Sequence, residues 1–118
     1  MSWADWLAQA GPVAGDAGIF GKAGGAQWAA AGNAVGVAPL GIGKGAPDTH
    51  MKMNSVDFDS DVGITVTVYR NKAKAGWGCV VAETNNTICV VVHTDKGNSA
   101  GAVAGCGALA KALKVANQ

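Results

Sequence analysis

The chain has 118 residues, the length of one domain, and can bury a sizeable hydrophobic core without disulfide bonds. Apolar residues make up 49% of the sequence and charged residues 14%, and the net charge is +1. This composition argues against a nucleic-acid-binding protein, which needs clustered lysine and arginine, and against a chain that is disordered throughout. We therefore expect a single folded domain over residues 1–118.

The first predicted element is a short helix that begins after Ser2. Asp5 follows Ser2 at the spacing of a capping box, and alanines favour helix up to the glycine-proline step at residues 11–12, where the helix should end. Trp3 and Trp6 are three residues apart, which places them on the same face of this helix. Large apolar side chains find little cover at a chain end, so the position of the two indoles needs an explanation.

The middle of the chain reads as strands and turns. Two apolar runs, residues 17–22 and 26–31, flank glycines and indicate a hairpin, although their alanines weaken the strand prediction. Residues 32–48 are rich in glycine and show no period, so we expect a loop with room for one helical turn. Polar turns at residues 59–61 and 84–86 separate strands within two further pairs. The four strands of these pairs are expected at residues 50–58, 63–70, 77–83 and 87–94.

The last predicted element is a helix over residues 98–118. Val103, Leu109 and Leu113 belong to an apolar series repeating at spacings of three and four. Three glycines inside the helix each cost about 1 kcal/mol against alanine, so packing must hold it, and another backbone could approach its glycine face. The order of helix, about six strands and helix predicts an α+β fold around a central antiparallel sheet.

Three cysteines, Cys79, Cys89 and Cys106, are widely spaced among small and aliphatic residues. They form no C-x-x-C pair, which excludes the common zinc and redox motifs. We expect buried reduced thiols, as in an intracellular protein, rather than a disulfide. The sequence has no signal peptide pattern and no apolar run of membrane-spanning length, so we expect a cytoplasmic protein.

The element order and several motifs resemble profilin, a family of small proteins that bind actin monomers. The opening SWADWL resembles the first helix of the family, and AGIFGKAGGAQWAA its first hairpin, with Trp28 on the second strand. KAGWG, TNNTICVVV and CGALAKALKVANQ resemble a turn, the central hairpin and the closing helix. The resemblance implies that the terminal helices pack together on one face of the sheet. It also implies a monomeric, cytoskeleton-associated protein that regulates filament assembly, with no cofactor.

A surface for proline-rich segments is the first site that the resemblance implies. Trp3, Trp6 and Trp28 would line a groove over Leu113, where indole rings stack on pyrrolidine rings and donate N–H groups to free carbonyls. On the spacing alone, ordinary core residues are the favoured interpretation of the tryptophans, and it is the resemblance that favours the groove. Alanine and glutamine replace family aromatic or histidine residues at positions 112 and 118, so we expect weak binding, limited to long proline runs.

The second implied site is a surface for monomeric actin. Most of its residues are small here, so specificity would rest on shape and on three cations, which could alternatively be a solvated strand edge. Carried over position by position, the actin surface comprises Arg70, Lys72, Lys74, Gly76, Gly78, Gly97, Asn98, Ala100, Ala104, Gly107 and Ala108. Phosphoinositide headgroups could contact Lys72, Lys111 and Lys114, although a net charge of +1 predicts a weak interaction. We expect actin binding weaker than is usual for the family.

Two further patterns in the sequence point to other functions. Asp57, Asp59 and Asp61 have the alternating spacing of a calcium loop, but no bidentate glutamate follows, so a solvated hairpin turn is the preferred interpretation. His50 and His93 lie far apart and no nucleophile motif accompanies them, so we do not expect an enzyme. The alternative function is a small scaffold or dimerisation module of the longin or roadblock kind, without actin binding. Exposed, clustered tryptophans would favour the profilin-like function, and separately buried ones would favour this alternative.

Overall fold

The computed structural model describes residues 2–44, 50–95 and 98–118. The fold is α+β, with one antiparallel sheet and helices at the two ends of the chain, as the sequence predicts. The strands are β1 (Ala17–Gly21), β2 (Gln27–Ala30), β3 (His50–Asp59), β4 (Ile64–Asn71), β5 (Gly78–Glu83) and β6 (Thr87–His93). The helices are α1 (Trp3–Trp6), α2 (Ser99–Val115) and the 3-10 segments η1 (Leu7–Asp16), η2 (Gly32–Ala34) and η3 (Pro39–Gly41).

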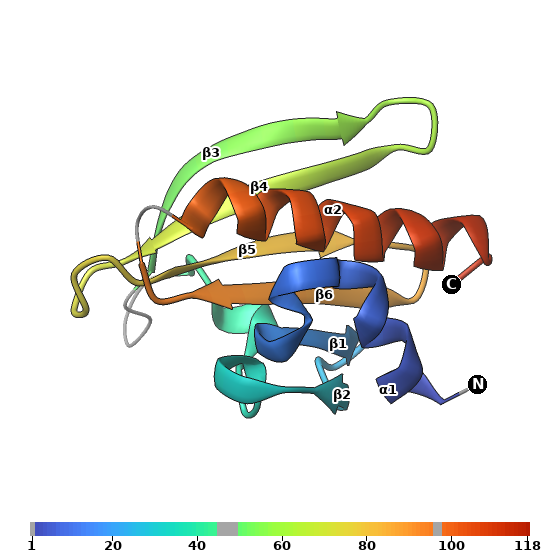
Figure 1. Cartoon of the computed structure of the whole chain (residues 1–118), viewed down its shortest axis with the longest axis horizontal. Coiled ribbons are helices and arrows are strands. Elements are labelled where there is room, and N and C mark those ends of the chain that lie inside the picture. The colour runs from blue at the N-terminus through green and yellow to red at the C-terminus, as the bar shows by residue number, and fades with distance from the viewer. Residues whose placement is uncertain (1, 45–49, 96–97) are drawn as a thin grey trace.

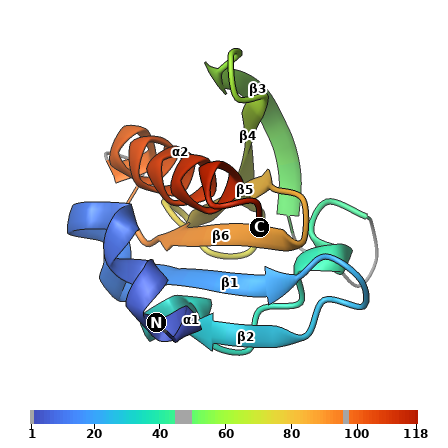
Figure 2. The same cartoon turned by 90° about the vertical axis from the view of Figure 1, so that its right-hand side faces the viewer.

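The six strands form one sheet in the order β2-β1-β6-β5-β4-β3, and every neighbouring pair is antiparallel. β1 lies beside β6 although the two are far apart in sequence, with Ala17 opposite Val91. Figure 1 shows α2 and η1 side by side on one face of the sheet, and Figure 2 shows the β3–β4 hairpin projecting past them. The helix arrangement implied by the resemblance is therefore present.

The first helix begins and breaks where the sequence predicts, and further helical turns follow the break. The amide of Ser2 donates to Asp5 Oδ2 at 3.0 Å and the amide of Asp5 donates to Ser2 Oγ, which completes the capping box. The helix breaks at Gly11, as predicted, and a second run of 3-10 turns, which the sequence did not predict, follows from Pro12 to Asp16. Gly11 adopts φ +63°, a conformation open to glycine, and Pro12 then starts the next turn without needing an amide donor.

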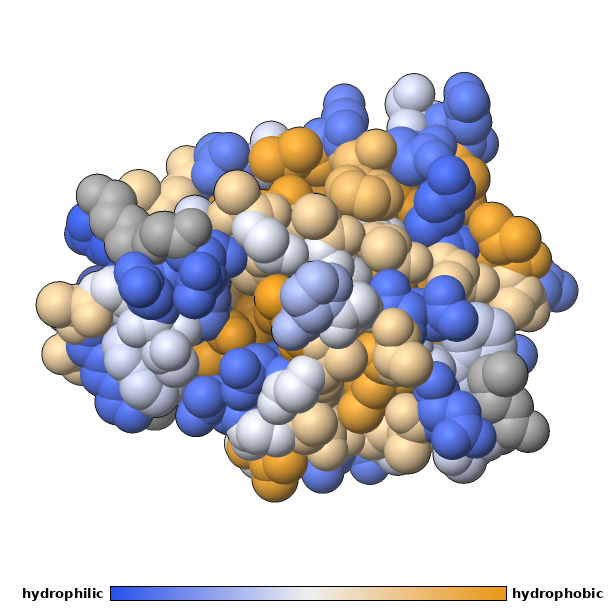
Figure 3. All heavy atoms as spheres, viewed as in Figure 1, coloured by the Kyte–Doolittle hydropathy of each residue, from blue (hydrophilic) through white to orange (hydrophobic). Residues whose placement is uncertain are grey.

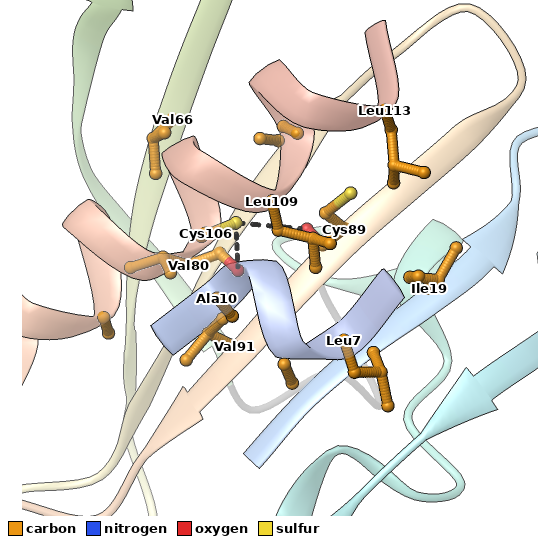
Figure 4. Close-up of a cluster of buried hydrophobic side chains, with 14 of the residues drawn as sticks. Leu7, Ala10, Ile19, Val66, Val80, Cys89, Val91, Cys106, Leu109 and Leu113 are labelled. Carbon is orange, nitrogen blue, oxygen red and sulfur yellow. Dashed lines mark hydrogen bonds between the residues drawn. The ribbon is translucent and has the colours of Figure 1, made fainter. Parts of the chain in front are cut away.

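The main hydrophobic core lies between the helices and the sheet. Leu109 and Leu113 of α2, Leu7 of η1 and Ile19 of β1 belong to one buried cluster (Figure 4). Gly105 lets the two terminal helices approach, since a Cβ there would lie 2.7 Å from the carbonyl oxygen of Ala10 and against Val13. The prediction that packing holds the glycine-containing helix, with a backbone close to its glycine face, is confirmed.

A second, smaller cluster lies on the opposite face of the sheet. Phe20, Ile42, Cys79, Ile88 and Val90 are its buried members. The segment predicted as a loop contains the short helical segments η2 and η3, and Ile42 directly follows η3, so this segment helps to cover the second cluster. The part of that prediction covering 45–48 lies outside the described residues. Over the described part of the chain, no helix has both the length and the apolar character needed to cross a membrane.

All three cysteines are buried thiols, as expected from the sequence. Cys106 Sγ donates to the carbonyl oxygens of Cys89 at 3.5 Å and Val80 at 3.8 Å. Burial raises the pKa of Cys89 to about 12, and it also raises the pKa of Cys106 well above its usual range. Thiolate, the reactive form, is therefore scarce at these sites in the folded protein.

We expect the native protein to resist a thiol-specific chromogenic reagent at mildly alkaline pH. The reagent needs both access and a thiolate, and Cys89, Cys106 and Cys79 are buried in the fold. In denaturant all three should react at the rate of a free cysteine. The rate at which absorbance rises, with and without denaturant, measures this difference. Rapid reaction of any thiol in the native protein would contradict the burial described here.

Candidate ligand-binding surface

Two of the predicted tryptophans meet at the edge of the sheet. Trp3 of α1 and Trp28 of β2 have ring centroids 4.7 Å apart, with planes inclined at 39°. Trp28 remains 40% exposed, while Trp3 is half-buried. The indole of Trp28 lies over Gly21, because a Cβ at this glycine would be 2.8 Å from Trp28 Cζ2. A glycine on β1 therefore lets the ring lie flat against the strand while one side stays open to a ligand.

Trp6, one helical turn from Trp3, borders an apolar hollow on the outer side of α2. We call this hollow the α2 trough. It is lined by Trp6, Phe58, Ala108, Lys111, Ala112, Val115 and Ala116. In Figure 3, apolar residues form much of the surface on the face that carries α2. α1 thus contributes one indole to the Trp3–Trp28 pair and the other to the α2 trough.

Leu113 does not form an accessible floor for a ligand. Its side chain is fully buried in the main core, beneath α2 (Figure 4). Leu113 belongs to the apolar face of α2, and this face points toward the sheet. Leu113 therefore supports the surface from below and cannot touch a ligand.

A second hollow lies beside Trp28, between the β1–β2 and β5–β6 turns. The lining of this Trp28 hollow comprises Lys22, Ala23, Trp28, Asn85, Asn86 and Gln118. The carbonyl oxygen of Gln118 accepts hydrogen bonds from the amide of Asn86 and, at 3.1 Å, from Thr84 Oγ1. Thr84 is itself buried and hydrogen-bonded to Thr87. These bonds hold the last residue of the described chain beside Trp28.

The charged residue of the α2 trough is neutralised by an ion pair. Lys111 Nζ lies 2.8 Å from Asp59 Oδ2. The hydrogen bond from Lys111 is the main reason that the pKa of Asp59 lies below its usual value, and the same bond raises the pKa of Lys111. Lys114 Nζ donates to the carbonyl oxygen of Gly63 at 3.3 Å. Both lysines that the sequence offers to phosphoinositides on α2 are thus in contact with the β3–β4 hairpin.

The three aspartates considered for calcium have separate roles in the hairpin. Asp59 accepts hydrogen bonds from the amides of Asp61 and Val62 in the β3–β4 turn, in addition to its ion pair with Lys111. Asp57 accepts a hydrogen bond from Thr65 Oγ1 across the two strands. Within the described residues, no group of three histidine, cysteine or acidic side chains could hold a metal ion. The arrangement is that of a hairpin turn.

The predicted actin surface is only partly accessible. Figure 1 places the β4–β5 turn, with Lys72, Lys74 and Gly76, at the same end of the molecule as the start of α2. Arg70, Asn98, Ala100 and Ala104 are exposed, and Ala108 is half-buried in the α2 trough.

Two glycines of the predicted actin surface are covered. Gly78 is buried, with the carbonyl oxygen of Tyr69 and the ring of His93 at contact distance from where its Cβ would be. Gly107 is buried beneath the ring of Phe58. Neither glycine can touch a partner directly, and Gly97 lies outside the described residues.

The sequence did not predict a role for two aromatic residues near these surfaces, Trp77 and Phe58. Lys74 Nζ lies 4.3 Å from the ring centroid of Trp77, a cation–π contact at the β4–β5 turn. Their three-residue separation in KAGWG was a usable signal. Phe58 carried no signal, because its contact with Gly107 joins parts of the chain that are distant in sequence.

No family model, curated protein or solved structure matches the chain. The chemistry of the surface must therefore be read from its residues. The surface offers indole faces and an indole N–H on each ring, and the lysine of the α2 trough is already paired. These features suit an extended, uncharged peptide that carries rings.

Proposed function

We propose that the protein binds proline-rich segments at its tryptophan surface and monomeric actin at the end formed by the β4–β5 turn and the start of α2. In this role it regulates filament assembly by equilibrium binding, in the manner of a profilin. The observation that carries the proposal is the Trp3–Trp28 pair, which keeps an exposed indole face where the chain's N-terminal helix meets the edge of the sheet.

A polyproline II helix suits this surface for physical reasons. It has no internal hydrogen bonds, so its carbonyls remain available to donors such as the indole N–H groups of Trp3 and Trp28. Its flat pyrrolidine rings can stack on the exposed face of Trp28. The ligand is already stiff, which reduces the conformational entropy lost on binding.

Support for the actin half of the proposal comes from the exposed surface at the start of α2. Arg70, Lys72 and Lys74 supply positive charge, and small residues at the start of α2 allow close approach of a partner. Trp77, held under Lys74, adds an aromatic group of the kind that anchors protein interfaces. With Gly78 and Gly107 covered, this surface is smaller than the resemblance implies, which favours modest affinity.

We expect Trp28→Ala to weaken binding of a ten-proline peptide by about tenfold or more, since an aromatic anchor at an interface is commonly worth 1–2 kcal/mol or more. Tryptophan fluorescence and isothermal calorimetry with increasing peptide measure the affinity. Trp77→Ala is the matched variant: it also removes one tryptophan, and we expect it to leave peptide affinity unchanged and to weaken capture of monomeric actin.

The paired variants separate the two halves of the proposal. Wild-type protein that shows no response to millimolar peptide would overturn the proline half. Failure of the wild type to retain actin monomer at tens of micromolar would overturn the actin half. Loss of both activities in Trp28→Ala with intact folding would contradict the placement of the two ligands at separate surfaces.

A further inference from the structure

The β3–β4 hairpin is fastened along α2 by three contacts from the hairpin's far end. The ring of Phe58 lies on Gly107, Asp59 pairs with Lys111 at 2.8 Å, and Lys114 reaches the carbonyl oxygen of Gly63. Figures 1 and 2 show this hairpin on one side of α2 and the N-terminal helices on the other. The C-terminal half of α2 is thus enclosed between two separate parts of the fold.

A β-bulge turns Phe58 toward α2. The pairing of β3 with β4 shifts register between Asp57 and Asp59, so Phe58 is the extra residue. Asp57 contacts Thr65 across the strands, whereas Asp59 reaches Lys111 on α2. Bulges commonly redirect a side chain in this way. Gly107 provides the space, because any Cβ there would collide with the Phe58 ring.

The α2 trough is a shallow, open hollow with an alanine floor. Ala108, Ala112 and Ala116 are spaced four residues apart, so they lie along one face of the helix. Phe58 borders the α2 trough from the β3–β4 hairpin, and Trp6 borders it from α1. Eight residues of helix rise about 12 Å, the length of about four residues of polyproline II.

The lining selects the kind of ligand. Apart from Lys111, which is paired with Asp59, the residues that line the trough are apolar or aromatic. Trp6 lies one turn from Trp3, whose ring contacts that of Trp28, so α1 carries one residue of the trough and one of the Trp3–Trp28 pair. An uncharged, extended chain with flat apolar rings fits both the lining and this arrangement.

We propose that Phe58 is a binding residue for the proline-rich ligand, which extends from the Trp3–Trp28 pair through the α2 trough. This inference rests on the proposed function and adds a contact from the β3–β4 hairpin. It makes affinity depend on ligand length: a short proline run is held at Trp3 and Trp28, and a longer run also gains Trp6, Phe58 and the alanine floor.

The test compares proline peptides of six and twelve residues by isothermal calorimetry. These peptides span about 19 Å and about 37 Å as polyproline II. We expect Phe58→Ala to weaken binding of the longer peptide by about tenfold, and to leave the shorter one unchanged, because an aromatic contact is worth about 1–1.5 kcal/mol. Trp28→Ala should weaken both peptides.

Further variants keep the test independent of folding. Phe58→Leu retains an apolar side chain over Gly107 and removes the ring, so we expect it to fold and still bind the longer peptide less well. Ala112→Glu places a charge on the trough floor without touching the core and should have the same effect. Ala38→Glu adds the same charge at an exposed position outside the trough, and it serves as the control.

The outcomes separate the two proposals. If the wild type binds both peptides and neither Phe58→Leu nor Ala112→Glu changes the preference for the longer one, the role of Phe58 is overturned and the proposed function stands. If the wild type binds neither peptide, the proposed proline function fails and the role of Phe58 fails with it. Loss of the length preference in both variants, with Ala38→Glu unaffected, supports the inference.

Discussion

Replacing Gly105 with alanine is expected to lower the free energy of unfolding by about 2–3 kcal/mol, because the added methyl group overpacks the contact between the terminal helices. Its Cβ would lie 2.7 Å from the carbonyl oxygen of Ala10 and against Val13. Part of this loss is offset, since alanine favours helix over glycine by about 1 kcal/mol. Urea denaturation followed by circular dichroism measures the change.

Gly101→Ala is the matched control for this substitution. Gly101 lies in the same helix, is exposed, and has no atom within 4 Å of where its Cβ would be. With no collision, the helix propensity gain should remain, and we expect stabilisation by about 0.5–1 kcal/mol. Equal effects of the two substitutions would show that α2 does not pack against η1 at Gly105.

Leu113→Ala should be the most destabilising of the substitutions considered, at about 2–5 kcal/mol, since it leaves a cavity in a core with little freedom to collapse. Leu113 is fully buried among residues of the main cluster. Because the side chain lies beneath the ligand surface, the folded fraction should keep its affinity for proline peptides. Denaturant unfolding gives the stability, and calorimetry under native conditions gives the affinity.

Val115→Ala is the companion variant for Leu113. Val115 is 69% exposed and lines the α2 trough, so its truncation should change stability little and reduce affinity for long proline peptides. A loss of affinity in Leu113→Ala without a loss of stability would place its side chain at the surface and contradict the packing described here.

β3 and β4 were predictable because their residues alternate, and β5 and β6 because they are rich in valine and isoleucine and are joined by a polar turn. β6 occupies Thr87–His93 against a predicted 87–94, and α2 occupies Ser99–Val115 within the predicted 98–118. The second run of helical turns, which follows the break at Gly11, was not predictable in this way. A glycine-proline step is compatible with a helix end or with a kink, and the packing of η1 against α2 decides between them.

The binding surface was predictable only as far as local spacing and the resemblance reached. They indicated Trp3 and Trp28, which do meet. They could not show that Leu113 and Gly107 are covered, because burial depends on which distant segment lies on top. The same limit applies to Phe58, whose position depends on a bulge and on a glycine elsewhere in the chain.

The pairing of β1 with β6 also has a consequence for how the chain folds. β3 to β6 follow one another along the chain and pair as sequential neighbours, so these contacts close short loops. Ala17 must find Val91 across more than half of the chain, and the entropy lost in that closure precedes any gain from the contact. We therefore expect this seam to form late and to set the folding rate, with the meander already assembled as its template.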